Sequence, residues 1–77
     1  MKKLLNTLFV TTEDAYLSLD GENVVISKDR QELARFPLHT LSGIIAFTYA
    51  GASPALMGGC AERGVSLSFC SPSGRLL

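Results

Sequence analysis

The segment from Gly51 to Leu77 most constrains the fold, because a capped helix, an alternating strand and a turn follow one another within it. Ser53 followed by Pro54 predicts a helix start, since a serine hydroxyl accepts a backbone N–H at the N-cap and proline suits the first helical position. Gly64 fits the helix end. One short helix set among strands is therefore expected here.

The apolar pattern of this segment indicates how its elements pack. In the helix, apolar residues recur every three to four positions and predict a buried stripe of Leu56, Met57, Cys60 and Ala61. From Val65 to Cys70 apolar and polar residues alternate, as in a half-buried strand. Ser71–Gly74 predicts a type I turn, and another strand is expected to begin at Arg75. Because only three residues follow that turn, we expect the chain to be a piece of a longer protein.

Strands are also predicted in the first half of the chain. Leu5–Val10 has strand composition, and Ala15–Lys28 predicts a hairpin in which Gly21 can take a positive φ. Leu33–Phe36 predicts a short or edge strand closed by Pro37, which lacks the N–H that a central ladder needs.

The run Gly43–Phe47 is continuously apolar, which is typical of a strand covered on both faces, so it is the expected centre of the core. A chain of 77 residues with 47% apolar residues can form one small domain with a marginal core, so self-association is expected. The predicted fold class is mainly β (α+β): a small β-sandwich-like domain of about six to seven short strands with one short helix.

Charge gives limited support for nucleic-acid binding. Seven basic residues balance seven acidic ones, which argues against a free-standing phosphate binder. A few local phosphate contacts remain open, and the candidate DNA contacts are Lys28, Arg30, Arg35 and Arg75. The negative charges of Asp29 and Glu32 partly cancel the positive charges of the first three candidates, so an ordinary solvated surface is the alternative.

No catalytic residue and no metal-ligand set is predicted. Asp20 and Glu22 share a tight turn and could reach one divalent cation, although solvated turn residues are the simpler interpretation. A nuclease acting through these two acids is the enzyme-class alternative. His39 lacks an identifiable nucleophile and orienting group. We expect no cofactor in these residues.

Cys60 and Cys70 form no CxxC pair, so reduced thiols in a reducing cytoplasm are expected. No segment approaches the roughly 20 apolar residues of a membrane span. The predicted location is cytoplasmic, without a membrane partner.

Three stretches carry a family resemblance: AYLSLDGENVVISKD, RFPLHTLSGIIAF and GASPALMGGCAERGVSLSFCSPSGR. Together they resemble the amino-terminal domain of the CRISPR-associated spacer-acquisition integrase, the larger subunit of the adaptation complex, and are most similar to its subtype I-C version. The resemblance covers nearly the whole chain.

The resemblance implies that residues 1–77 are the amino-terminal β-rich domain of a longer integrase, a metal-dependent DNA endonuclease. The acids and histidine that bind its divalent metal (Mg or Mn) belong to a helical domain absent here. Implied partners are a second copy in a homodimer, the small second subunit of the adaptation complex, and double-stranded DNA. The expected function is therefore a non-catalytic dimerisation and assembly domain, with an independent nucleic-acid-binding β module as the alternative.

Overall fold

Strand pairing divides the chain into two sheets. The structure is a computed structural model and describes residues 2–4, 6–71 and 73–76. The elements in chain order are β1 (Lys2–Leu4), β2 (Thr7–Val10), β3 (Tyr16–Asp20), β4 (Asn23–Lys28), β5 (Gln31–Pro37), the 3-10 helix η1 (Leu38–Thr40), β6 (Gly43–Phe47), α1 (Pro54–Arg63) and β7 (Ser66–Cys70). Strands β3-β4-β5 form an antiparallel meander sheet. Strands β1-β2-β6-β7 form a mixed sheet, in which β6 pairs in parallel with both β2 and β7.

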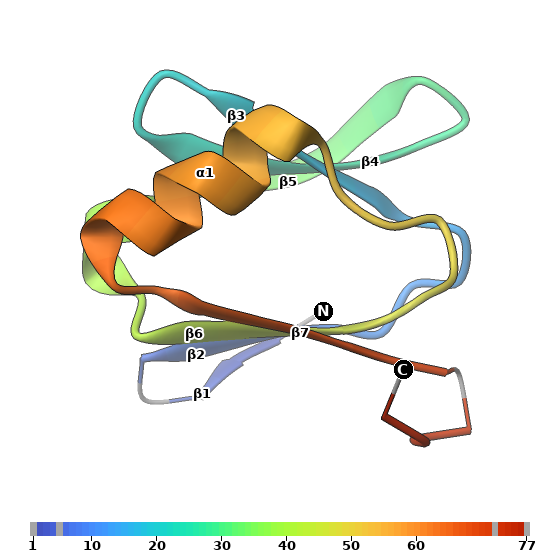
Figure 1. The fold of residues 1–77 in the computed structure, drawn as a ribbon. Helices are drawn as coiled ribbons and strands as arrows, with labels where there is room; N and C mark the ends of the chain where they lie inside the picture. Colours follow the sequence, from blue (N-terminus) through green and yellow to red (C-terminus); the bar gives the residue numbers. More distant parts are fainter. Residues whose placement is uncertain (1, 5, 72, 77) are drawn as a thin grey trace.

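The two sheets lie face to face, and α1 crosses one open side between them (Figure 1). The helix contacts β3 of the meander sheet and β7 of the mixed sheet, so it links the two layers. This arrangement confirms the predicted mainly β fold with one short helix.

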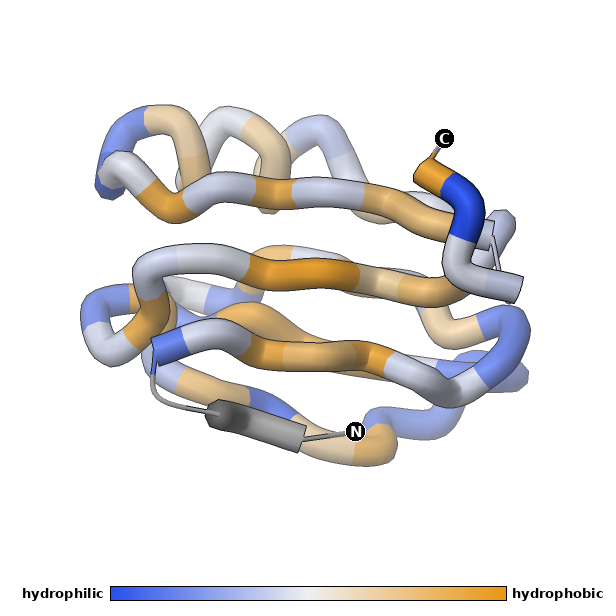
Figure 2. The backbone as a smooth tube through the Cα atoms, turned by 90° about the horizontal axis from the view of Figure 1, so that it is seen from below, coloured by the Kyte–Doolittle hydropathy of each residue, from blue (hydrophilic) through white to orange (hydrophobic). Residues whose placement is uncertain are grey.

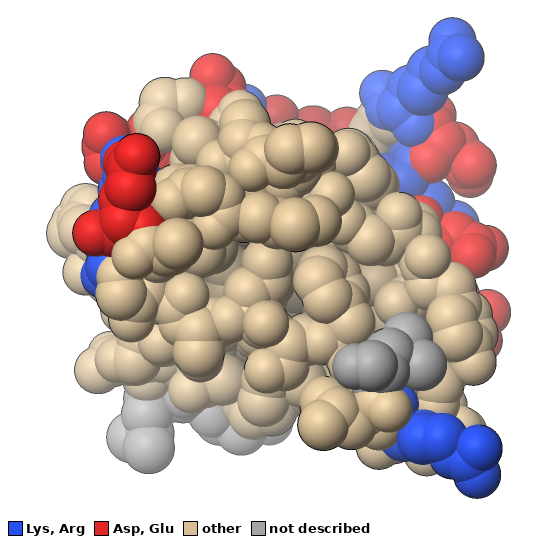
Figure 3. Space-filling view, viewed as in Figure 1, with Lys and Arg blue, Asp and Glu red and all other residues tan. Residues whose placement is uncertain are grey.

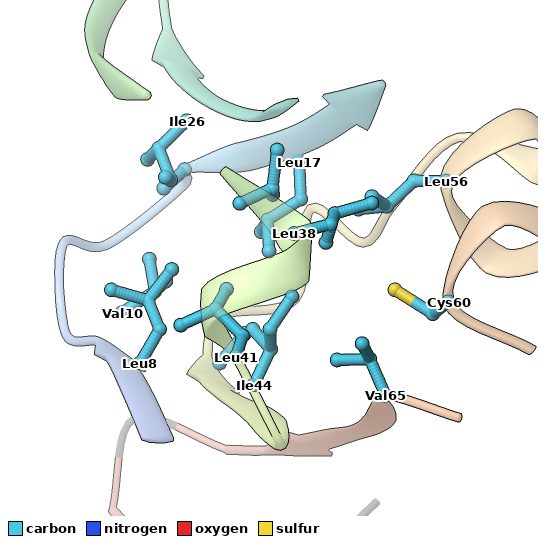
Figure 4. Packing of buried hydrophobic residues seen from close by; sticks show 13 residues of the cluster. Leu8, Val10, Leu17, Ile26, Leu38, Leu41, Ile44, Leu56, Cys60 and Val65 are labelled. Atoms are coloured by element: carbon cyan, nitrogen blue, oxygen red, sulfur yellow. The ribbon is translucent and has the colours of Figure 1, made fainter. Parts of the chain in front are cut away.

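The core fills the space between the sheets, because each strand turns its alternate apolar side chains inward. Side chains from both sheets, from η1 and from α1 point toward one another in Figure 4. The buried cluster consists of Leu8, Val10, Ala15, Leu17, Val24, Ile26, Leu38, Leu41, Ile44, Ala46, Leu56, Cys60 and Val65. Burying each of the larger side chains contributes about 1.5–3 kcal/mol.

The predicted hairpin is confirmed, and its second arm forms a further hairpin. β3 and β4 pair from Tyr16 with Ser27 to Asp20 with Asn23, and Gly21 supplies a φ of 60° in the turn. β5 is longer than the predicted Leu33–Phe36, because a tight turn at Asp29 and Arg30 lets β5 pair with β4 from Gln31 onward. As predicted, β5 lies at the edge of its sheet.

The helix ends as predicted, but its buried face differs. The Ser53 hydroxyl accepts the Leu56 N–H at 3.1 Å, and Gly64 closes the helix with a φ of 67°. The buried residues are Leu56, Gly59 and Cys60, so the prediction that Met57 and Ala61 belong to the buried stripe is wrong. The cause is close packing on β3: a Cβ at Gly59 would lie 3.2 Å from a methyl carbon of Leu19.

Predictions at the two chain ends are confirmed only in part. The first strand pair was missed, since β1 precedes β2 and β2 begins at Thr7; Leu5 lies outside the described residues. At the other end, the Gly74 N–H donates to the Ser71 carbonyl at 2.8 Å, which closes the predicted turn, although Pro72 lies outside the described residues. Leu76 then forms a bridge to Cys70.

Strand β6 is central in the mixed sheet, but only one of its faces lies in the core. Ile44 and Ala46 are fully buried in the core. Ile45 and Phe47 alternate with them on the other side of the sheet, where they are half-buried and lie outside the core cluster.

Candidate nucleic-acid interface

Two of the predicted DNA contacts lie at the tip of the β4–β5 hairpin. Lys28 pairs with Gln31, which leaves Asp29 and Arg30 as a two-residue turn with φ angles of 52° and 65°. Such left-handed conformations suit glycine or asparagine and cost other residues roughly 1 kcal/mol or more. The tip therefore exposes an arginine in a strained backbone conformation.

Arg35 does not join this tip. It pairs with Val25, three positions along β4 from Lys28, or about 10 Å away. Its guanidinium donates to Asp20 at 3.0 Å and to both carboxylate oxygens of Glu32 at 2.6 and 2.9 Å. The hydrogen bonds that Arg35 donates, first to Glu32 and then to Asp20, raise the pKa of Arg35. The hydrogen bond from Arg35 also lowers the pKa of the Glu32 carboxyl. Two carboxylates thus compensate its charge.

Arg75 lies in the other layer of the sandwich, just after the last turn. Its backbone N–H donates to the Ser71 hydroxyl at 3.1 Å, and its carbonyl accepts the Ser71 N–H at 2.6 Å. Figure 1 places this turn and the β4–β5 tip at the same end of the molecule, with the β2–β3 loop between the layers. That loop carries Glu13 and Asp14, so acidic residues separate the basic ones.

On one face of the molecule, charged side chains lie only near parts of the margin (Figure 3). In Figure 3 they lie along the margins of the view, while the centre over α1 carries none. In α1, charge begins only at Glu62 and Arg63 near its end. Basic residues therefore do not form one continuous patch on this face.

The two acids of the β3–β4 turn accept hydrogen bonds from different arginines. Asp20 accepts from Arg35, whereas Glu22 accepts two N–H groups of Arg63 at 2.7 and 3.0 Å. Within the described ranges no group of three or more His, Cys, Asp or Glu residues could hold a metal ion, and no pocket is found.

The role of Arg63 was missed at the sequence level. Its Nη1 donates to the Gly59 carbonyl at 3.0 Å, inside the last turn of α1, where a cation also meets the helix dipole favourably. A basic residue near the end of a helix could have predicted the local hydrogen bond from Arg63 to the Gly59 carbonyl. Glu22 is 41 residues away, so nothing local indicated it as the partner.

Both cysteines are free thiols, as expected. Cys60 faces the core, where burial raises its pKa. Cys70 is half-buried on β7. In the part of the chain that the structure covers, no helix has the length and apolar character to cross a membrane.

The two-sheet architecture crossed by one helix is the fold of solved Cas1 structures. A Cas1 protein from Thermotoga maritima superposes with a TM-score of 0.79 over the whole chain, at 8% identity and covering 23% of that chain. A partial Cas6-RT-Cas1–Cas2 complex gives a TM-score of 0.81 over 92% of this chain and 21% of that chain, at 15% identity. A TtCas1–DNA complex gives 0.66 over 88% of this chain and 26% of that chain, at 16% identity.

Residues 8–77 match the family model described as CRISPR associated protein Cas1, so the chain belongs to the Cas1 family. CRISPR-associated endonuclease Cas1 1 of Chlorobaculum tepidum is 54% identical over all 77 residues, and Cas1 2 of Rhodospirillum rubrum is 44% identical over 97% of this chain. The chain spans about a fifth of these relatives, 22% of each. It corresponds to the N-terminal domain of a Cas1 endonuclease.

Proposed function

We propose that this chain is the non-catalytic assembly domain of a longer CRISPR integrase. In this role it dimerises, orients two integrase subunits, and adds weak contacts to DNA held across the dimer. The observation that carries the proposal is the family match over residues 8–77 combined with coverage of only 22% of the relatives' length.

The reactive centre of the whole protein is assigned to the part of the relatives that this chain does not cover. There a divalent metal, Mg or Mn, would serve endonuclease and integrase chemistry. One observation supports a non-catalytic role for the present residues. Asp20 and Glu22, the pair considered for a cation, each neutralise a different arginine.

The proposed partners come from the family and from its solved complexes. One related structure is a Cas1–Cas2 complex and another is a Cas1–DNA complex. We therefore assign this chain a second copy of itself, a small Cas2-type subunit and double-stranded DNA as partners. A subtype I-C system and a cytoplasmic location belong to the same proposal.

Sedimentation velocity across micromolar concentrations tests the assembly role. A reversible monomer–dimer equilibrium is expected. A chain that stays monomeric at every concentration would contradict the dimerisation part of the proposal.

A second function, independent DNA binding, is favoured by the exposed Arg30 in its strained turn. Fluorescence anisotropy with a duplex at low salt tests it, and each lost phosphate contact lowers the salt slope by about 0.9. Arg30→Ala and Arg75→Ala should each weaken binding. Arg35→Ala is the matched control, because two carboxylates already hold that side chain. Negligible affinity at low salt would leave only the assembly role.

A further inference from the structure

The β4–β5 hairpin carries one extra residue, Leu33, close to its tip. Ile26 of β4 pairs with Ala34 of β5. The next residue of β4, Ser27, pairs with Glu32. Leu33 therefore has no partner in the ladder, and it is 46% exposed. Such a bulge sets two residues of one strand opposite one residue of the other, so the extra residue lies within β5 and not in the turn.

The turn of this hairpin is short as a result. It consists of only Asp29 and Arg30, whose φ angles are 52° and 65°. A two-residue hairpin turn of this kind needs the left-handed conformation at both positions and favours asparagine and glycine there. Three-residue hairpin loops usually need it only at their last residue. Moving the extra residue from β5 into the turn would therefore relieve the strain at Arg30.

The bulge also brings Glu32 and Arg35 to the same side of β5. In a regular strand successive side chains alternate, so residues three apart point to opposite sides. Across the bulge these two side chains meet, and the Arg35 guanidinium donates to both carboxylate oxygens of Glu32 at 2.6 and 2.9 Å. The ion pair depends on the extra residue being in β5, so it stabilises the observed register.

We infer that the tip of the β4–β5 hairpin exchanges between the observed register and a second register, in which the extra residue lies in the turn. In the second register residues 29–31 form a three-residue loop, Lys28 pairs with Glu32, and Ser27 pairs with Leu33. The pairs from Ile26 to the far end of the hairpin stay as they are. This exchange requires neither a second copy of the chain nor DNA.

The two registers offer interactions of similar strength. The second register gives up the ion pair between Glu32 and Arg35, which is weak because the two side chains are 45% and 43% exposed. In return Glu32 gains Lys28 as an oppositely charged residue directly across the ladder. Arg30 also leaves its left-handed conformation. The second register is therefore expected as a minor state, in about 0.1–10% of molecules.

The exchange leaves the core undisturbed. Residues 29–33 are all exposed, and Figure 2 shows hydrophilic residues in the turns at this end of the molecule, which lies on the right in both views. β4 is held from its other side, since Ser27 pairs with Tyr16 and its hydroxyl donates to the Tyr16 carbonyl at 3.3 Å. Only the tip of β5 moves, and the move shifts Arg30 from the end of a short turn to the middle of a longer loop. An anion that binds Arg30 better in one position would favour that register.

Chemical-exchange saturation transfer NMR on the labelled chain tests the inference, because it reports the backbone chemical shifts of a minor state. Shift changes are expected only near residues 28–33. In the minor state Asp29 and Arg30 should have the shifts of right-handed backbone, and Gln31 those of left-handed backbone.

Two variants should move the balance in opposite directions. Gln31→Gly supplies glycine at the position where the longer loop needs the left-handed conformation, so it should raise the ratio of second to observed register at least about fivefold. The double variant Asp29→Asn, Arg30→Gly is the matched control. It gives the two-residue turn the residues that this turn prefers and should abolish the exchange.

The outcomes decide between one register and two. A second register seen in the wild type, or seen only in Gln31→Gly, supports the inference. The inference is wrong if the wild type shows no minor state and Gln31→Gly keeps left-handed shifts at Asp29 and Arg30. It is equally wrong if the exchange extends along the whole β4–β5 ladder, because the hairpin then opens as a unit. If Gln31→Gly fails to fold, the wild type and the double variant decide.

Discussion

Arg63 at the end of α1 and Glu22 in the β3–β4 turn are joined by two hydrogen bonds that converge on one carboxylate oxygen, at 2.7 and 3.0 Å. The same guanidinium donates to the Gly59 carbonyl at 3.0 Å. Arg63 therefore links the last turn of the helix to the meander sheet.

A double-mutant cycle with Arg63→Ala and Glu22→Ala should give a coupling energy below about 1 kcal/mol. The Glu22 side chain is 71% exposed, so water and salt screen the pair. Urea unfolding measures each variant, and the coupling should shrink further in high salt. A coupling that salt leaves unchanged would contradict this account.

The adjacent glycines of α1 should respond oppositely to alanine. Gly58→Ala meets nothing within 4 Å and should stabilise the protein by up to about 1 kcal/mol, since glycine weakens a helix interior. Gly59→Ala gains the same helix propensity, but its Cβ would press on Leu19 at 3.2 Å and on Arg63 at 3.3 Å. It should therefore be less stable than Gly58→Ala by at least about 1 kcal/mol. Equal urea midpoints for the two variants would show that β3 moves away from the added Cβ without a loss of stability.

Thr48→Val should destabilise the fold by about 1–3 kcal/mol, because it leaves buried polar groups unpaired. The Thr48 hydroxyl donates to the Ala15 carbonyl and accepts the Ala50 N–H, both at 3.1 Å, and the residue is 1% exposed. Thermal or urea unfolding measures the change. Thr40→Val is the control: its hydroxyl donates to the Pro37 carbonyl at 2.8 Å, but water can replace a bond at this exposed site.

Glu32 should make stability depend on pH in the acid range. Its pKa is lowered in the folded state by the Arg35 hydrogen bond, so its contribution is complete above the unfolded value of about 4.3 and is lost as pH falls through the lower folded value. Urea unfolding at several pH values should show wild type losing its advantage over Glu32→Gln below about pH 4. In an Arg35→Ala background the two should respond alike. A stability difference between wild type and Glu32→Gln that does not change with pH would contradict this prediction.

Local patterns predicted the elements whose signals lie within a few residues of each other. Alternation and Gly21 predicted the β3–β4 hairpin, and Ser53 with Gly64 predicted the limits of α1. The β4–β5 turn escaped prediction because Asp29 and Arg30 adopt the left-handed conformation without a glycine. Tertiary contacts fixed what periodicity could not: packing of Gly59 on β3 decided which face of α1 is buried.

The site was less predictable than the fold. Sequence proximity grouped Arg35 with Lys28 and Arg30, but Arg35 lies farther along β5 from the tip, and its guanidinium pairs with Asp20 of β3. The parallel pairing of β6 with β2 and β7 also had no local signal, so the strand order of the mixed sheet could not be predicted from the sequence. Whether the four basic residues contact DNA stays a prediction.

The parallel pairs of the mixed sheet have a consequence for how this chain folds. The meander sheet needs only two tight turns, so it can assemble early from neighbouring residues. β6 can pair with β2 only after the chain closes a loop that contains the whole meander sheet. β7 can pair with β6 only after the chain closes a loop that contains α1. The strands that join last are the uncharged ones, and during synthesis they are the most exposed to aggregation and to capture by chaperones.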